Sequence, residues 1–450
     1  MRTWTRIWAT SCIGAVALLS LACGDRRGDV EPEASVAPTA SVAPVPTAAA
    51  STPGPANPPP TVVHGAPVRE RVLLSPVYEV DRLYPSMTGP NSTETVKLGE
   101  QSDAAPELVW VVGFEATMVA ADGATPASQE FMCHTNLDVD PIDHRARFGE
   151  KKPITGRLFT LSQGQYRIDM PLGFGIPVQS DESILVNTQV LNLNEEGGAP
   201  PVRHRVSLRY VRDAELARPL TPLYVAGAYG LKLLEGEDGH YGLDPAATGA
   251  TSGDALHRAG TAPASSAAAG KDPPSMDTQH TACLPGTNAG TNAFDDGRGR
   301  SFTGHWVVPP GREVNHTRVT DLMALPFDTT LHYVAVHLHP FAETLELKDL
   351  TTGNTVYRAK ARQADRGVGL AHVDFFSSQE GIPLYRDHEY EIVSVYNNTS
   401  GVPQDSMAVM NLYLRDMEFR APGVRAGDGA PSPSPSASGP APRPQMMGAR

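Results

Sequence analysis

The chain has 450 residues, carries a formal net charge of -13 at pH 7, and only 19% of its residues are charged. This acidity argues against nucleic acid and against an anionic membrane surface as binding partners. Once the low-complexity ends are set aside, roughly 350 residues remain, which is enough for two domains.

The first 23 residues have the pattern of an export signal. Two arginines precede an apolar run at 13–22 that is too short to be a dedicated membrane span. The run ends in Ser20-Leu21-Ala22-Cys23, which resembles a bacterial lipobox and predicts a lipid on Cys23. Gly24 favours the outer membrane, because an aspartate there would suggest retention in the inner membrane. The alternative is an ordinary cleaved signal with an incidental cysteine.

Composition divides the rest of the chain. Segments rich in Pro, Ala, Ser, Thr and Gly cannot bury enough apolar area to offset the entropy of ordering, so we expect disorder there. The sequence therefore predicts a lipoprotein signal peptide at 1–23, a disordered tether at 24–66, an N-terminal β-sandwich at 67–238, a flexible insertion at 239–300, a C-terminal β-sandwich at 301–420 and a disordered tail at 421–450.

The two central segments are strand-like almost throughout. Short runs of β-branched, aliphatic and aromatic residues, such as 108–114, 157–161 and 204–211, alternate with clusters of Gly, Pro and Asn. No long stretch has apolar residues at helical spacing. The sequence predicts an all-β fold of two antiparallel, jelly-roll-like sandwiches in tandem.

Export would place the cysteines in an oxidising compartment. If Cys23 carries lipid, Cys133 and Cys283 are left as an even pair of the mature chain. We expect them to form a disulfide that ties the insertion to the first sandwich.

The strongest chemical signal is the run at 331–338, which has the composition of a buried strand and leads into His337-Leu338-His339-Pro340. Side chains two apart on a strand share a face, so the two imidazoles should lie together. Pro340 has no N–H to continue the ladder. The pair predicts two ligands of a copper or zinc site. The alternative is two histidines without a metal.

A second strand-like run at 404–414 carries methionines. Met407, Asn411 and Tyr413 share one parity, whereas Met410 has the other. A thioether beside two imidazoles suits copper that cycles between Cu(I) and Cu(II). The alternative for Met407 is a core-filling role.

The order of these motifs carries a resemblance. His-x-His, a Gly/Asn-rich connection, Asp-x-Met and Asn-Leu-Tyr resemble the C-terminal copper domain of the peptidylglycine α-hydroxylating and dopamine β-monooxygenase family. The resemblance implies that His337, His339 and Met407 hold the copper that activates dioxygen, with ascorbate or another reductant as electron donor. It also implies substrate-binding roles for Asn411 and Tyr413. Alignment on Asn-Leu-Tyr instead of Asp-x-Met would move the methionine position close to Val409 or Met410, whereas parity favours Met407.

The likeness extends to the first domain, with departures. Where the family has a tandem histidine pair, this chain has Cys133-His134, and the third histidine position holds Leu191. The first copper site is therefore degenerate, although a second site rebuilt from His134 and His280, with or without His305, is conceivable. Ala335 stands where the amidating enzymes have a carboxylate-binding arginine, which argues against a peptide C-terminus as substrate.

Taken together, the sequence predicts a copper-dependent, monooxygenase-like lipoprotein of the bacterial cell envelope. It would hydroxylate an unidentified small-molecule or peptide substrate at one copper ion, or hold two ions if the second site exists. The alternatives are a non-catalytic copper-binding protein and a structural or interaction protein of the envelope. No Gly-x-Ser-x-Gly, P-loop or His-Glu-x-x-His motif supports a hydrolase or a nucleotide-binding protein.

Overall fold

A computed structural model describes residues 59–86, 88–99, 105–152, 154–233, 241–242, 293–295 and 301–422. All of them belong to one compact unit, Pro46–Arg450. The signal segment with Cys23, most of the tether, the part of the insertion that holds His280 and Cys283, and the tail from residue 423 lie outside the described residues. No helix among the residues described is long and apolar enough to cross a membrane.

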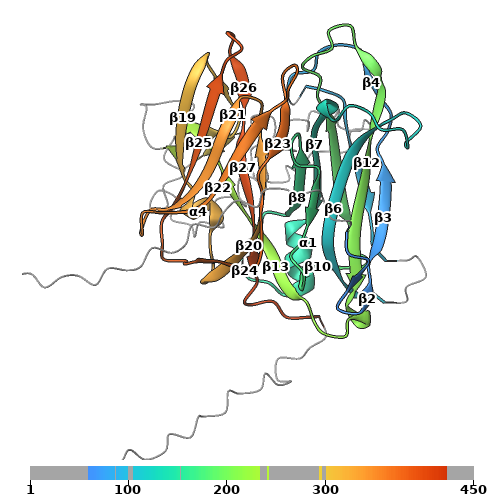
Figure 1. Ribbon diagram of the computed structural model, residues 1–450. Coiled ribbons are helices and arrows are strands. Elements are labelled where there is room, and N and C mark those ends of the chain that lie inside the picture. Colours follow the sequence, from blue (N-terminus) through green and yellow to red (C-terminus); the bar gives the residue numbers. More distant parts are fainter. Residues whose placement is uncertain are drawn as a thin grey trace, which may run out of the picture. The chain divides into compact units, whose positions relative to one another are not determined.

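The predicted all-β fold is confirmed, since strands make up most of the described chain (Figure 1). The helices among the described residues are few and short: η1 (Gln129–Phe131), α1 (Pro141–Phe148), η2 (Asp213–Glu215) and α4 (Thr320–Met323). Helix α1 begins after Asp140, whose carboxylate accepts hydrogen bonds from the first backbone N–H groups, and ends at Gly149 with φ of 63°.

The N-terminal sandwich packs two sheets around its own apolar core. One sheet has four strands in the order β5 (Asn91–Val96), β11 (Ile184–Val190), β7 (Met132–Val139) and β8 (Arg157–Ser162). The other contains β10 (Phe174–Gln179), β6 (Leu108–Ala120), β12 (Ala199–Arg212) and β3 (Arg69–Leu74), with β4 (Tyr78–Val80) on β12 and β9 (Arg167–Asp169) on β6. The hairpin of β1 (Val62–Val63) and β2 (Ala66–Pro67) precedes them.

The C-terminal sandwich also has two main sheets. One comprises β24 (Phe376–Leu384), β20 (Thr329–Leu338), β27 (Ala408–Arg415) and β13 (Thr221–Tyr229). The other comprises β15 (Tyr241–Gly242), β19 (Gly311–Arg318), β25 (Tyr390–Asn398), β21 (Ala342–Asp349), β22 (Asn354–Gln363) and β23 (Leu370–Val373). Two small sheets complete it: β18 (Trp306–Val308) with β26 (Gln404–Ser406), and β14 (Lys232–Leu233) with β17 (Ser301–Thr303) and β16 (Ala293–Asp295).

Strand β13 corrects the expected boundary near residue 238. Chain order assigned this strand to the first sandwich, but its backbone pairs with β27 from Leu223 with Arg415 to Tyr229 with Val409. Its start also pairs in parallel with β10, so the two sandwiches share a continuous ten-stranded sheet (Figure 1). Hydrogen bonds between distant segments, rather than chain order, decide which sheet a strand joins.

Strand β20 separates two environments because successive side chains point to opposite sides. Val334, Val336 and Leu338 belong to the apolar core of the C-terminal sandwich. Tyr333 and Ala335 pack instead with the core of the N-terminal sandwich. The sheet that carries β20 therefore packs against a different apolar core on each side.

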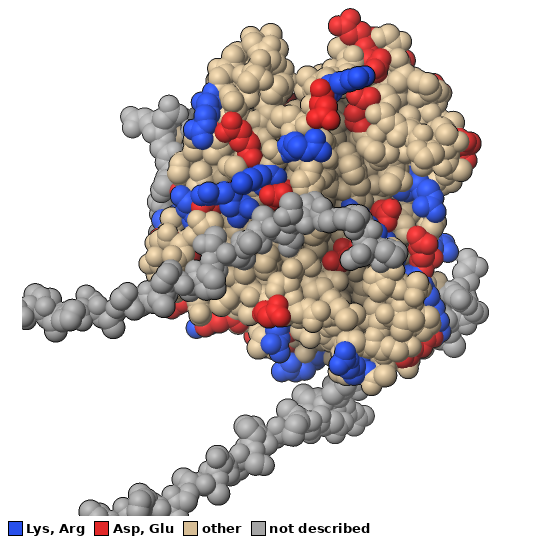
Figure 2. Space-filling model, viewed as in Figure 1, with Lys and Arg blue, Asp and Glu red and all other residues tan. Residues whose placement is uncertain are grey.

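Polar contacts join the two sandwiches on this second side. Gln165 accepts a hydrogen bond from the Val336 N–H at 3.1 Å and donates one to the Tyr333 hydroxyl at 3.1 Å. The buried Lys152 lies 2.7 Å from Asp416. On the face of the molecule in Figure 2, acidic and basic side chains are interspersed, and neither sign forms a large patch.

Candidate metal centre

The end of β20 brings two imidazoles together as its sequence predicted. The ring centroids of His337 and His339 are 5.2 Å apart and the rings are nearly perpendicular. Both residues are buried, and β20 ends at Leu338, two residues before Pro340. The predicted adjacency of the two histidines is confirmed.

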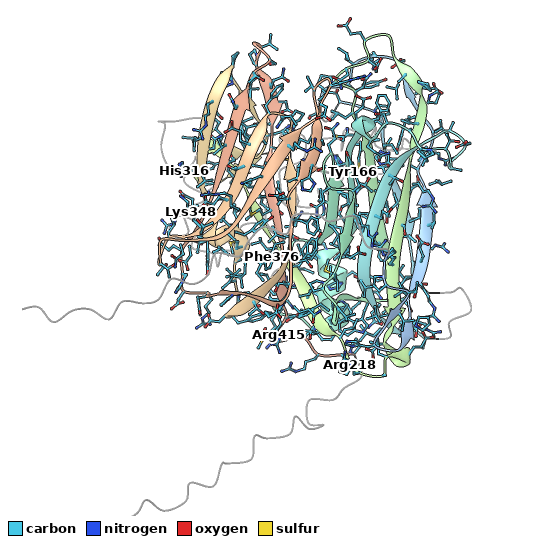
Figure 3. All side chains as sticks on the ribbon, viewed as in Figure 1. Tyr166, Arg218, His316, Lys348, Phe376 and Arg415 are labelled. Carbon is cyan, nitrogen blue, oxygen red and sulfur yellow. The ribbon has the colours of Figure 1, made fainter. Side chains whose placement is uncertain are left out.

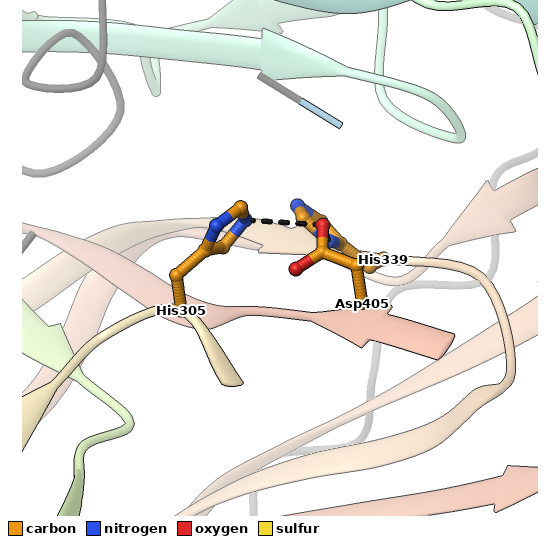
Figure 4. Close-up of side chains that lie close together, drawn as sticks. All are labelled: His305, His339 and Asp405. Atoms are coloured by element: carbon orange, nitrogen blue, oxygen red, sulfur yellow. Dashed lines mark ion pairs between the residues drawn. The ribbon is translucent and has the colours of Figure 1, made fainter. Parts of the chain in front are cut away.

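A third imidazole and a carboxylate join His339 from other segments. His305 lies just before β18, and Asp405 is the middle residue of β26, which pairs with β18. The ring centroids of His305 and His339 are 5.1 Å apart. Asp405 Oδ2 lies 3.3 Å from His305 Nε2 and 3.2 Å from His339 Nδ1 (Figure 4).

These distances fit ligands of one ion. His305, His339 and Asp405 form the one group of His, Cys, Asp or Glu ligand atoms within 4.8 Å of one another in the described part of the chain. With metal–ligand bonds of about 2.0–2.1 Å, two atoms on a tetrahedral ion lie about 3.3–3.4 Å apart. Both nitrogen–oxygen separations are close to that value. Two imidazoles and one carboxylate can hold a transition metal and leave coordination positions open.

The electrostatics favour an ionised carboxylate here. Burial by itself would raise the pKa of Asp405, but the neighbouring imidazoles of His339 and His305 outweigh it and hold that pKa below its ordinary value. The side chain of His339 is 6% exposed, whereas that of Asp405 is 34% exposed. The group is therefore open to solvent on the Asp405 side.

The position of His339 is fixed from several directions. Ser86 of the N-terminal sandwich places its hydroxyl 3.4 Å from His339 Nδ1. The following turn contains Phe341 with φ of 70°, an uncommon conformation for a residue other than glycine. Gln363 accepts a hydrogen bond from the Phe341 N–H, and Asn397 donates one to its carbonyl.

Met407 lies between β26 and β27, where the alternation of side chains is interrupted. It is fully buried in the apolar core of the C-terminal sandwich, and its carbonyl accepts a hydrogen bond from Tyr396. The residue that β27 pairs with His337 is Val409. The methionine as a copper ligand stays a prediction.

The other predicted residues lie in several places. His134 and Asn411 line one cavity together with His337. Tyr413 is fully buried and donates a hydrogen bond to the Leu158 carbonyl at 2.9 Å, which a substrate would have to displace. Met410 packs in the apolar core of the C-terminal sandwich.

The sites that involve residues outside the described part of the chain stay predictions. Cys133 is buried on β7, whereas its expected partner Cys283, the candidate ligand His280 and the lipidation site Cys23 lie outside the described residues.

Sequence reasoning missed Asp405 and undervalued His305. Asp405 appeared only as part of the Asp-x-Met pattern, although a carboxylate two residues from a candidate ligand is itself a candidate. Nothing local connects His305 to His339, because the link depends on the pairing of β18 with β26.

Comparison with known proteins adds little. No family model matches the chain, and no curated protein matches it. Similar solved structures include the STIV MCP, with a TM-score of 0.29 and 7% identity over 77% of this chain and 96% of that one. Another is PBCV-1 VP54, as fitted into a reconstruction of the virophage Sputnik, with a TM-score of 0.28 and 8% identity over 79% of this chain and 96% of that one. Likenesses of this strength carry no argument.

Proposed function

We propose that this protein is a copper-dependent oxygenase of the bacterial cell envelope, with the ion held by His305, His339 and Asp405. The observation that carries the proposal is the position of Asp405 Oδ2, 3.3 Å and 3.2 Å from nitrogens of the two imidazoles. Three donors meet there: His339 just after β20, Asp405 on β26 and His305 just before β18. This arrangement modifies the set of His337, His339 and Met407 that the resemblance implied.

The chemistry proposed is hydroxylation of a C–H bond. One atom of dioxygen enters the substrate and the other leaves as water, which consumes two electrons and two protons. Copper would accept electrons singly from a reductant such as ascorbate and bind dioxygen. The protein contributes two imidazoles, an ionised carboxylate and a solvent-exposed side on which a small molecule can approach.

The three ligand residues are compatible with more than one metal. Copper follows from the sequence resemblance and from imidazole ligation, whereas two histidines with one carboxylate also suit iron(II). The purified protein should be stripped of metal and titrated with Cu(II), Fe(II) and Zn(II) in competition. Preferential binding of Fe(II) would contradict the copper assignment but not the site.

A second candidate function is a non-catalytic copper-binding protein. Two observations favour it: His339 is almost fully buried, and the Tyr413 hydroxyl is already bonded to the Leu158 carbonyl. Such a protein would bind copper with the same ligands but consume no oxygen.

The test compares His339→Ala and His305→Ala with His316→Ala as the matched control. His316 lies on β19, its side chain is 46% exposed, and Figure 3 labels it. The two site variants should lose most of the bound copper and the reductant-dependent uptake of oxygen, whereas the control should keep both. Full copper content in the His339→Ala variant would refute the site, and copper binding without oxygen uptake would support the second candidate.

The envelope location is part of the proposal and has its own test. Cys23 would carry the lipid that anchors the mature chain to the membrane, and Cys23→Ser should release the protein into the soluble fraction. Incorporation of labelled palmitate into the Cys23→Ser variant would contradict this assignment.

A further inference from the structure

Strand β18, which pairs with β26 beside the proposed ion, has one side in the core and one in solvent. Trp306 and Val308 are buried in the apolar core of the C-terminal sandwich, whereas Val307 between them is 58% exposed. Because successive side chains of a strand point to opposite sides, Val307 lies on the solvent side. A single exposed valine is ordinary, so its meaning depends on what it borders.

Val307 borders a ligand of the proposed ion. The register pairs it directly with Asp405 across the two strands. Side chains directly opposite in an antiparallel pair share one side of the sheet, with Cβ atoms about 4.5–5.5 Å apart. His305 lies two residues before Val307, and in Figure 4 its side chain projects to the same side as that of Asp405. Val307 therefore lies beside the ion site on its solvent-exposed side.

The exposed apolar surface continues beyond Val307 on both strands. The last pair of the register joins Val308 with Gln404, and Pro309 and Pro403 follow it. Both prolines are exposed, and the ladder ends with them because proline has no N–H to donate. We call Val307, Pro309 and Pro403 the apolar strip. It runs from the ion site to the end of the two strands.

The polar groups around the site include no counter-charge for an ionic substrate. Within the described residues, Asp405 makes ion pairs with the imidazoles of His305 and His339 and with no lysine or arginine. The N-terminal sandwich brings the hydroxyl of Ser86, a neutral group, to 3.4 Å from His339 Nδ1. Removing apolar area from water is the main favourable term that the strip can offer to a ligand.

We propose that the apolar strip binds the substrate, and that the substrate is a neutral molecule with an apolar group next to the C–H bond that is hydroxylated. This inference rests on the proposed function, because it takes the ion at His305, His339 and Asp405 as the reacting centre. An apolar group lying on Val307 is held beside the exposed side of Asp405. The strip thereby selects for the substrate without supplying a charge.

The first experiment locates the binding surface in the metal-free, full-length protein. Three probes of similar size are titrated into protein with 13C-labelled valine methyl groups: neutral benzyl alcohol, anionic benzenesulfonate and cationic benzyltrimethylammonium. The Val307 resonances are assigned by their absence from the Val307→Leu variant. Benzyl alcohol should shift the Val307 methyl resonances, and the two charged probes should shift them less.

The second experiment measures how close the bound probe lies to the ion. The protein is loaded with Cu(II), and the paramagnetic broadening of the benzyl alcohol protons is compared with that of a Zn(II)-loaded reference. Val307→Asn should weaken benzyl alcohol binding about fourfold or more, which is the effect of losing at least one buried methylene. Val307→Leu should keep the binding. Val72→Asn, on β3 of the N-terminal sandwich, is the exposed control and should behave as wild type.

The outcomes separate this inference from the proposed function. Copper that binds to the protein while benzyl alcohol leaves the Val307 methyl groups unshifted would overturn the inference alone. Equal responses to the three probes, or a Val307→Asn variant that binds benzyl alcohol as wild type does, would overturn it as well. Loss of copper binding altogether would refute the proposed function, whatever the Val307 resonances show.

Discussion

The two faces of strand β20 differ in character: one is apolar, and the other carries polar side chains. Val334, Val336 and Leu338 face the apolar core of the C-terminal sandwich. Tyr333 and His337, on the other parity, face the N-terminal sandwich, where buried polar groups are frequent. The first face is stabilised mainly by the removal of apolar area from water, whereas the second depends on individual hydrogen bonds and ion pairs.

This difference has a practical meaning for the site. A close-packed apolar face tolerates little movement, so it holds the backbone of β20 in place. The polar face can then present imidazoles at defined positions to the other sandwich. Mutations that affect polar contacts and mutations that affect the apolar core should therefore lower the free energy of unfolding by different amounts. The loss of a buried ion pair should have the largest effect, and the loss of a single hydroxyl the smallest.

The largest effect should come from the buried ion pair between the sandwiches. Lys152→Met leaves Asp416 and Glu150 buried without the ammonium that lies 2.7 Å from each. Removing one partner of a buried pair costs about 3–5 kcal/mol. Urea denaturation should show a loss of this size. A loss below about 1 kcal/mol would mean that water reaches these carboxylates.

Leu338→Ala tests the apolar face. Leu338 is 2% exposed in the core of the C-terminal sandwich. The substitution removes buried methyl groups and leaves a cavity, at a cost of about 2–5 kcal/mol. Denaturation measured with metal chelated should show this loss. If the variant loses the same free energy of unfolding with and without copper, the substitution affects packing and not metal binding.

Acid should weaken the N-terminal sandwich through His204. This residue is fully buried, its Nδ1 lies 2.9 Å from the Thr135 hydroxyl, and burial lowers its pKa to about 3. Because the unfolded chain binds the proton first, the contribution of His204 is complete above about pH 6.5 and is lost as pH falls toward 3, by at most about 1.4 kcal/mol per pH unit.

The variant His204→Gln isolates that contribution. The free energy of unfolding, measured from pH 7 down to pH 4 without metal, should fall less steeply in the variant than in wild type. Parallel curves would show that His204 is not buried in its neutral form. The exposed His316→Gln substitution serves as the control and should leave the slope unchanged.

The smallest effect should come from one hydroxyl on β27, whose side chain packs with the core of the N-terminal sandwich. Tyr413→Phe removes the hydrogen bond to the Leu158 carbonyl, which is 2.9 Å long. A typical net loss is about 0.5–1.5 kcal/mol in the free energy of unfolding. If Tyr413 also contacts a substrate, oxygen uptake should fall by more than this stability change explains. Unaltered kinetics would remove Tyr413 from the substrate site.

Much of the local structure could be predicted from sequence. The strand at 331–338 and the common face of His337 and His339 follow from a period of two. The end of the strand before Pro340 follows from the N–H that proline lacks. Parity alone does not fix the side chain of Met407, because the strand is interrupted at this residue, between β26 and β27. Periodicity holds only within one continuous strand.

The all-β class and the adjacency of the two imidazoles at the end of β20 could be predicted, because both depend on residues close together in the chain. Three features arise only when distant segments pack together: β13 pairs with the second sandwich, His305 and Asp405 meet His339, and His134 shares a cavity with His337. These meetings depend on which distant strands pair and which sheets pack together. The free energy of that choice is spread over the whole core, so no short segment encodes it.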